Sequence, residues 1–347
     1  MVDTSEILVS WAAYFDQKVS KRKNITDLYL KYVADLTEKG YPPVFNFEHL
    51  ALLIGVDSAV LASIVVSSEK FYRSFHLPKR TGGYREIDVP VPVLLEAQKW
   101  IKKEILDKVG VHESAHGFIR GKSIVSNAKE HLGAGCILKM DIEDFFPSIK
   151  IRRGISIFLN IGFPPKVSYY LAALCFREGA LPQGSPASPS ISNIVAKRLD
   201  ARLLGLAKAN NLKYTRYADD IVFSGDQVGS HLISSIVSIM HLEGFRPNTK
   251  KTQIVCGRTK KIVTGISISS GKLALPRASV RKIKQEAHFL LKRGYWLHVK
   301  ATGNRDPILV ERLLGKVGFW LQIDPENKTA QKLYTELIAL SNTTDAV

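Results

Sequence analysis

Apolar and polar positions alternate at helical spacing through the first 66 residues. Residues 1–40 carry helical patterns, and residues 47–66 give two apolar helices on either side of Gly55. A helix-turn-helix and an ordinary packed pair of helices both fit this second pattern, and we expect the packed pair. The sequence therefore predicts a helical N-terminal region.

Strand-like patterns follow. Residues 71–75 and 84–90 favour strands, and the Gly82-Gly83 pair between them predicts a hairpin turn. A helix is expected over 93–109. Residues 136–141 form a short apolar run that ends on an aspartate, which is typical of a buried strand that delivers a carboxylate at its end.

The second half of the chain mixes strands and helices again. A Pro/Gly/Ser-rich loop over 182–189 enters a helix over 190–210, and two strand-like runs flank Ala218-Asp219-Asp220. A further amphipathic helix ends at Gly244, and the chain is mainly helical from 278 to 340. This order predicts an α+β fold with a separate helical domain.

Acidic residues stand where these strands end. Asp141 closes the buried run, and Asp219 and Asp220 lie in a tight turn. Magnesium ions prefer hard oxygen ligands such as carboxylates, and two such ions can serve phosphoryl transfer. Turn propensity alone also explains an Asp-Asp pair, so its meaning depends on the surrounding motifs.

Charge points to a polyanionic partner. The formal net charge is +17, and the segment from Lys250 to Lys316 holds 16 Lys/Arg against 3 Asp/Glu. A solvated helix face would mix both signs, whereas phosphate neutralisation uses such an excess. A membrane surface is the competing interpretation. We expect no membrane contact, because no Lys/Arg-rich amphipathic helix stands out and no segment is long enough to span a bilayer.

Cysteines and the N-terminus suggest a compartment. Cys136, Cys175 and Cys256 are far apart and lack CxxC spacing, which argues against a disulfide framework or a structural zinc site. The first residues carry acids and no long apolar core, so no secretory signal is expected. Together these features fit a reducing cytosol and predict a cytoplasmic protein.

Three motifs in order resemble those of reverse transcriptases. Tyr217-Ala218-Asp219-Asp220 resembles their YxDD box, the sequence MDIEDFFPS at 140–148 resembles their first catalytic motif, and LPQGSPASP at 181–189 resembles their template- and nucleotide-positioning loop. The resemblance implies a right-hand polymerase fold of the α+β class, with fingers, a palm of antiparallel sheet plus helices, and a basic, mainly helical thumb. The implied limits are 1–66 for an N-terminal helical region, 67–140 and 150–212 for fingers with interleaved palm, 141–149 and 213–268 for palm, and 269–347 for thumb.

The resemblance also implies catalytic roles. Asp141, Asp219 and Asp220 would bind two Mg²⁺ ions, for which Mn²⁺ is a substitute, and Ile142 would lend its backbone. Phe146 matches the steric gate that excludes a ribose 2′-hydroxyl, with core packing as its alternative. The residues implied to contact the dNTP are Lys79, Arg80, Arg85, Phe146, Gln183, Gly184 and Lys251.

Physical reasons support several of these dNTP contacts. The planar guanidinium of Arg85 suits phosphate oxygens, and Gly184 permits close backbone approach. The resemblance further implies that Lys251 approaches the pyrophosphate as a general acid. Ordinary exposed cations and a Pro-rich helix start are the alternative interpretations.

Two further boxes resemble those of the retron type of reverse transcriptase. The sequence NAKEH at 127–131 matches an NAxxH box, and Val263-Thr264-Gly265 matches a VTG box, while HGFIRGKSI at 116–124 is also similar. Helix capping or a polar core pocket would account for the Asn and His equally well. The RNA-binding residues implied by the boxes and the basic thumb are Asn127, His131, Val263, Thr264, Gly265, Arg281, Lys282, Lys284, Lys292 and Arg293.

Membership of this type would imply an RNA-directed DNA polymerase that binds a structured noncoding RNA from its own locus. Such an enzyme primes from an internal guanosine 2′-hydroxyl and makes multicopy single-stranded DNA in a branched RNA–DNA product, within an anti-phage defence system that includes an effector protein. The alternatives are another prokaryotic reverse transcriptase, of the group II intron or diversity-generating kind, and a non-catalytic RNA-binding scaffold. The intact Asp141, Asp219 and Asp220 argue against the scaffold.

Overall fold

The computed structural model describes residues 4–18, 23–79, 82–302 and 306–344. They form two compact units, and each is described by itself. The first unit comprises Met1–Ala115, Ile142–Leu203 and Ile236–Pro247, and the second comprises His116–Asp141, Leu204–Ser235 and Asn248–Val347. The limits of fingers, palm and thumb given above stay a prediction.

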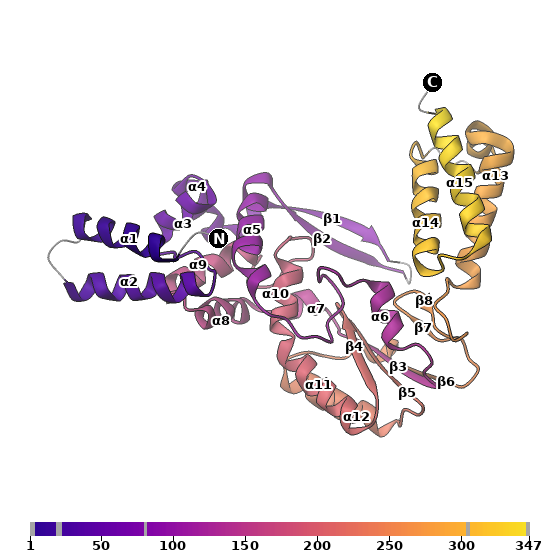
Figure 1. Cartoon of the computed structure of the whole chain (residues 1–347), viewed down its shortest axis with the longest axis horizontal. Coiled ribbons are helices and arrows are strands. Elements are labelled where there is room, and N and C mark those ends of the chain that lie inside the picture. Colours follow the sequence, from indigo (N-terminus) through magenta and orange to yellow (C-terminus); the bar gives the residue numbers. More distant parts are fainter. Residues whose placement is uncertain (1–3, 19–22, 80–81, 303–305, 345–347) are drawn as a thin grey trace. The chain divides into compact units, whose positions relative to one another are not determined.

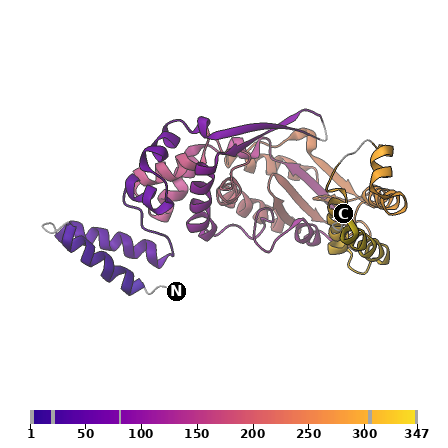
Figure 2. The ribbon, with the colours of Figure 1, turned by 90° about the horizontal axis from the view of Figure 1, so that it is seen from above.

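Helices begin the first unit, as the sequence predicts. Helices α1 (Thr4–Lys18) and α2 (Lys23–Glu38) lie side by side (Figures 1 and 2), and the ring of Phe15 stacks on Tyr29 at 5.4 Å. The expected packed pair is confirmed as α3 (Phe47–Ile54) and α4 (Ser58–Val66). Among the described helices, none alone is long and apolar enough to cross a bilayer. Only α3 and α4 taken together reach that length, and they are bent by 109°.

The predicted hairpin is also present in the first unit. After a 3₁₀ turn, η1 (Ser68–Phe71), strand β1 (Tyr72–Pro78) pairs antiparallel with β2 (Tyr84–Pro90), from Tyr72 opposite Pro90 to Pro78 opposite Tyr84. Gly82 and Gly83 have φ angles of 88° and 78°, which glycine adopts without steric cost.

The rest of the first unit is helical. Helices α8 and α9 pack together, α5 packs on α9, and their buried faces are apolar, with Phe158 and Leu171 fully buried. Helices α11 and α12 each contribute residues to both units. The bounds are α5 (Pro92–Glu104), η2 (Leu106–Lys108), α7 (Phe145–Ser148), α8 (Ile151–Ile161), α9 (Pro165–Cys175), α10 (Ser188–Val195), α11 (Lys197–Ala209) and α12 (His231–Leu242).

A four-stranded antiparallel sheet with strand order β4-β5-β3-β6 organises the second unit. The strands are β3 (Cys136–Asp141), β4 (Lys213–Tyr217), β5 (Asp220–Gly225) and β6 (Gln253–Cys256). Strand β3 lies inside the sheet, and five of its six residues are buried, which explains its continuous apolar run. Helix α6 (Ile124–Glu130) packs on β4 and on the small hairpin of β7 (Ile262–Val263) and β8 (Ile266–Ser267).

The sheet corrects one expectation about the cysteines. The register places Cys136 of β3 opposite Cys256 of β6, with Cα atoms 4.1 Å apart, and the two sulfur atoms are bonded. The prediction that the cysteines form no disulfide is therefore wrong for this pair. The residues are 120 apart in sequence, so only the strand pairing reveals their proximity. Cys175 is free and buried.

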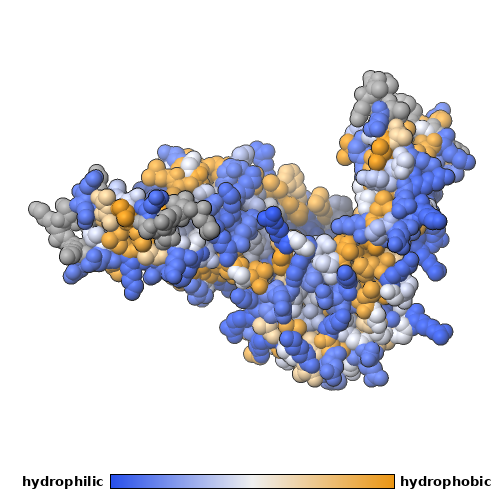
Figure 3. Space-filling view, viewed as in Figure 1, coloured by the Kyte–Doolittle hydropathy of each residue, from blue (hydrophilic) through white to orange (hydrophobic). Residues whose placement is uncertain are grey.

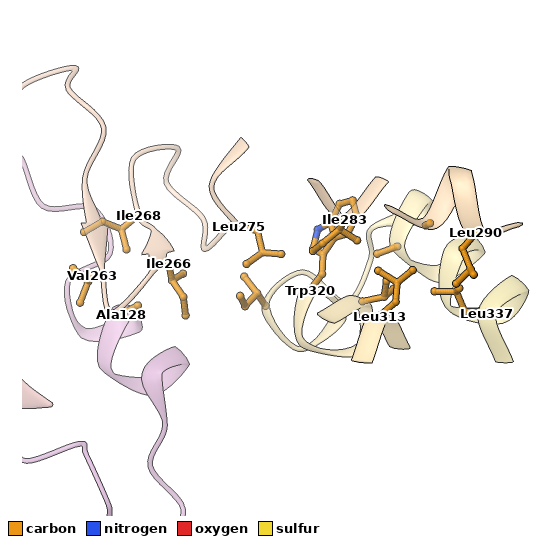
Figure 4. Packing of buried hydrophobic residues seen from close by; sticks show 14 of the residues in the cluster. Ala128, Val263, Ile266, Ile268, Leu275, Ile283, Leu290, Leu313, Trp320 and Leu337 are labelled. Carbon is orange, nitrogen blue, oxygen red and sulfur yellow. The ribbon is translucent and has the colours of Figure 1, made fainter. Parts of the chain in front are cut away.

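Three helices complete the second unit: α13 (Arg277–Thr302), α14 (Leu309–Ile323) and α15 (Lys328–Thr344). Their apolar faces share one core cluster with residues of α6 and the β7–β8 hairpin (Figure 4). Leu313, Trp320 and Leu337 lie in the helical part of this cluster, and Ala128 and Ile266 lie in the part next to the sheet. The predicted helical end of the chain is confirmed.

This cluster yields a test with neighbouring residues on α15. Leu337 is fully buried, whereas 39% of Ile338 is exposed. We expect Leu337→Ala to destabilise the helical part by roughly 2–5 kcal/mol through lost burial and a cavity, and Ile338→Ala by less than about 1 kcal/mol. Hydrogen exchange of the α15 amides measures both. Equal protection in the two variants would contradict the proposed packing.

Candidate active site

Strand register brings the acidic residues together. Strand β4 ends at Tyr217 and β5 begins at Asp220, so Ala218 and Asp219 form a two-residue turn, with Ala218 at a φ of 55°. Strand β3 runs beside β5 and places Asp141 directly opposite Asp220. Asp219 and Asp220, which lie 78 and 79 residues after Asp141 in sequence, therefore meet Asp141 at one end of the sheet.

Burial and the neighbouring carboxylates alter the protonation of Asp220. Burial and, after it, repulsion from Asp219 and Asp141 raise the pKa of Asp220 from 3.8 to about 6, against the attraction of Lys251 and Lys139. The Asp220 side chain still reaches solvent, so a cation can approach it. The site thus concentrates negative charge that a cation would relieve.

Lys251 supplies a positive charge at this place. It is the last residue of the short 3₁₀ turn η3 (Thr249–Lys251), and its Nζ donates to Asp141 Oδ2 at 2.8 Å. The hydrogen bond to Asp141 raises the pKa of Lys251, and the other two carboxylates add to this effect. The loop is fixed by Asn248, whose backbone N–H donates to the Asp141 carbonyl at 2.7 Å.

The carboxylates fit a divalent cation by their chemistry. They are hard oxygen donors, and the ammonium of Lys251 already balances part of their charge. Within the described residues, however, no group of three or more His, Cys, Asp or Glu is arranged to hold a metal ion as it stands. Ile142 is buried and paired with Pro247. The role of its backbone at the metal site stays a prediction.

The predicted nucleotide loop lies in the first unit against strand β2. The backbone N–H of Asp88 donates to the Gln183 carbonyl at 2.8 Å, and Gly184 has a φ of 135°. A Cβ at Gly184 would come within 2.6 Å of the Asp88 carbonyl oxygen. Only glycine fits this approach to the Asp88 backbone, whereas the approach of Gly184 to a nucleotide stays a prediction.

The other residues predicted to contact the dNTP are exposed, half-buried or outside the described part of the chain. Lys79 and Arg85 are exposed on the β1–β2 hairpin, and Arg80 lies outside the described residues. Phe146 is half-buried, with its ring 5.5 Å from that of Phe145, so both the steric gate and core packing remain compatible with its position. The dNTP-binding roles of all these residues stay predictions.

Sequence motifs miss an ion pair that fastens the β1–β2 hairpin to the segment after α9. Arg177 forms an ion pair with Asp88 and donates to Ser74 Oγ at 2.9 Å, and Ser74 also donates to Asp88 at 2.8 Å. Asp88 and Arg177 are 89 residues apart and belong to none of the motifs. The pair secures the same part of β2 that contacts Gln183.

The NAxxH box lies in the interior of the second unit. His131 is fully buried, and its two ring nitrogens lie 2.7 Å from Ser224 Oγ on β5 and 2.7 Å from Thr215 Oγ1 on β4. Burial lowers the pKa of His131 to about 3, so the ring is neutral and donates through one nitrogen while accepting through the other. His131 thereby joins the two strands that flank the Ala218-Asp219 turn.

The VTG box contacts helix α6, which carries Asn127 of the NAxxH box. Asn127, also fully buried, donates from Nδ2 to Thr264 Oγ1 at 3.4 Å, and Thr264 donates to the Ile124 carbonyl at 3.1 Å. Val263 is buried, whereas Gly265 is exposed. The positions of Asn127, His131 and Val263 therefore do not support the direct RNA contacts expected above. Motif matching identifies such residues without showing which way their side chains point.

Basic residues expected to bind RNA lie on the surface, unlike the buried residues of the two boxes. Hydrophilic side chains gather over the α13 edge (Figure 3). The described cations there are exposed, as an RNA contact requires, and Arg293 has a side chain outside the described part. The exposed residues are Arg281, Lys282, Lys284 and Lys292.

Comparisons with known proteins agree with this chemistry. Residues 77–290 match the family described as reverse transcriptase (RNA-dependent DNA polymerase). The chain is 33% identical over 316 residues to retron Mx162 reverse transcriptase of Myxococcus xanthus, covering 81% of this chain and 63% of the relative's length. It is 30% identical over 309 residues to retron Ec86 reverse transcriptase of Escherichia coli, covering 88% and 92%.

One solved structure shows a weaker likeness. Telomerase from Candida albicans, in complex with a fragment of telomeric RNA, aligns with a TM-score of 0.45 and 11% identity, covering 77% of this chain and 62% of that one.

The Asp220 environment predicts an unusual dependence of stability on pH. The folded pKa of about 6 exceeds the ordinary 3.8, so the contribution of Asp220 to stability is present below the ordinary value and is lost as pH rises through the folded one. In chelator, we expect Asp220→Asn to be more stable relative to wild type at about pH 7.5 than at about pH 5. Denaturant unfolding measures this difference, and a pH-independent difference would contradict it.

Because His131 bridges two buried hydroxyls, we expect its removal to lower stability and compensating substitutions to restore it. His131→Ala leaves the buried hydroxyls of Thr215 and Ser224 without their partner, at a cost of roughly 2–4 kcal/mol. The triple change His131→Leu, Thr215→Val and Ser224→Ala removes all three polar groups, so we expect it to recover much of that loss. Denaturant unfolding compares these variants.

A matched control is the exposed His241 of α12, whose replacement by Ala should leave unfolding unchanged. If His131→Ala kept wild-type stability while RNA binding was lost, the bridge would be the wrong role for His131 and direct RNA contact the right one.

Proposed function

Because this chain belongs to the retron reverse transcriptases, and so to the RNA-directed DNA polymerases, we propose that it copies part of a structured noncoding RNA encoded at its own locus. Priming starts from the 2′-hydroxyl of an internal guanosine. The product is multicopy single-stranded DNA that stays joined to RNA by a branch. The observation that carries the proposal is the convergence of Asp141 with Asp219 and Asp220 at one end of the sheet.

The residues of this site have definable roles in nucleotide addition. Bound divalent cations, two Mg²⁺ ions or Mn²⁺ in their place, would help to deprotonate the attacking hydroxyl and offset the charge of the leaving pyrophosphate. The three aspartates hold the negative charge that attracts these ions. Lys251, whose Nζ donates to Asp141 Oδ2, would supply the proton that the oxygen of the leaving pyrophosphate takes up.

Substrate and partner contacts follow from charge and shape. The family selects dNTPs, for which Phe146, Arg85 and Gly184 are the proposed contacts. RNA stems are recognised through phosphates, 2′-hydroxyls and shape, and a net charge of +17 favours such binding. A cytoplasmic location and an effector protein for anti-phage defence complete the proposal.

The test uses the locus as it occurs. The chain would be expressed with its upstream noncoding region, and the recovered nucleic acid treated with debranching enzyme and with RNase. We expect a short DNA whose mobility changes after debranching, and its loss in the double variant Asp219→Asn, Asp220→Asn, because both metal-binding carboxylates are gone.

A parallel primer-extension assay on an unrelated RNA template separates the two parts of the proposal. Extension without any branched product in cells would overturn the retron role and leave the polymerase in place. Extension that survives the double variant would overturn the role of the acidic residues.

A further inference from the structure

Phe118 lies beside the catalytic turn in a backbone conformation that aromatic residues seldom adopt. Its φ is 63°, in the left-handed region, and half of its surface is exposed. Non-glycine residues persist there only where the surrounding structure imposes the conformation, and they occur often at functional sites. Core packing does not explain a ring that is 50% exposed.

Contacts with the turn impose this conformation. The backbone N–H of His116 donates to the Arg216 carbonyl at 2.7 Å. Gly117 lies so close that a Cβ there would come within 2.6 Å of the Ala218 nitrogen. The segment 116–118 is therefore fitted onto Arg216–Ala218, and Phe118 cannot move away without breaking these contacts.

The ring of Phe118 faces that of Tyr217. Their centroids are 6.4 Å apart with 40° between the planes, and Tyr217 also keeps partial exposure. Two accessible rings therefore stand close to the turn that carries Asp219. Accessible aromatic rings in polymerases and single-strand binding proteins offer faces on which bases stack without regard to sequence.

We propose that Phe118, together with Tyr217, holds the base of the nucleotide at the primer terminus. This nucleotide carries the attacking hydroxyl, so it must approach the aspartates of the turn more closely than any other part of the primer. A dNTP triphosphate, by contrast, is recognised by cations rather than rings. Phe118 is thus a positioning residue for the attacking hydroxyl. The inference rests on the polymerase activity but not on the retron RNA or its branch.

The test measures binding without chemistry. A fluorescent primer–template duplex is titrated with the full chain in the absence of dNTPs, and the last primer nucleotide either carries its base or is abasic. We expect Phe118→Ala to weaken binding of the normal primer roughly tenfold, and to bind the abasic primer as wild type does. Phe118→Trp should restore the preference for the base.

Two further variants serve as controls. Tyr169 on α9 is 45% exposed, and Tyr169→Ala should bind both primers like wild type. Phe118→Gly removes the ring but suits the positive φ, so it should lose base-dependent binding while keeping its melting temperature. The proposal is overturned if Phe118→Gly binds normally, or if Phe118→Ala weakens both primers equally. Because wild-type primer extension is measured alongside, failure of this contact is distinct from failure of the polymerase assignment.

Discussion

Asp141 and Asp220 lie opposite each other at the ends of two paired strands, next to Asp219, so the sheet holds three acidic groups where they repel. Much of the second unit can be understood as what keeps this arrangement in place. Strand β3 is buried inside the sheet and fixes the position of Asp141. Lys251, positioned by the loop that Asn248 ties to Asp141, balances part of the charge.

The strands that carry the aspartates are supported from helix α6. His131 connects β4 to β5 through two hydroxyls, and Asn127 connects the same helix to Thr264. The NAxxH and VTG boxes are thus in contact through α6, a helix of seven residues. Because α6 and the β7–β8 hairpin share a core cluster with α13–α15, we infer that the boxes serve to connect the catalytic strands to the basic helical end.

Sequence alone gives the chemistry of this site better than its contacts. The three aspartates and the β1–β2 hairpin could be predicted because their motifs encode backbone needs: a tight turn and a Gly-Gly reversal. The pairs Asp88–Arg177 and Cys136–Cys256 could not, because each joins segments about 90 or more residues apart through ordinary residues. The buried positions of Asn127 and His131 were also out of reach, since a polar box fits an interior bridge and a surface contact equally well.

The charges of the chain serve two purposes that the structure separates. The cations on α13 are exposed and unevenly distributed in sequence, which suits reversible, salt-dependent contact with phosphates. Lys251 differs, because it is bound to a buried carboxylate of Asp141, and a divalent cation at this site would compete with it. In the proposed reaction Asp141 would hold that cation, and Lys251 would supply a proton to the pyrophosphate. A site whose carboxylates were less crowded would hold neither the lysine nor the metal as firmly, so the repulsion at the strand ends is a condition of the chemistry.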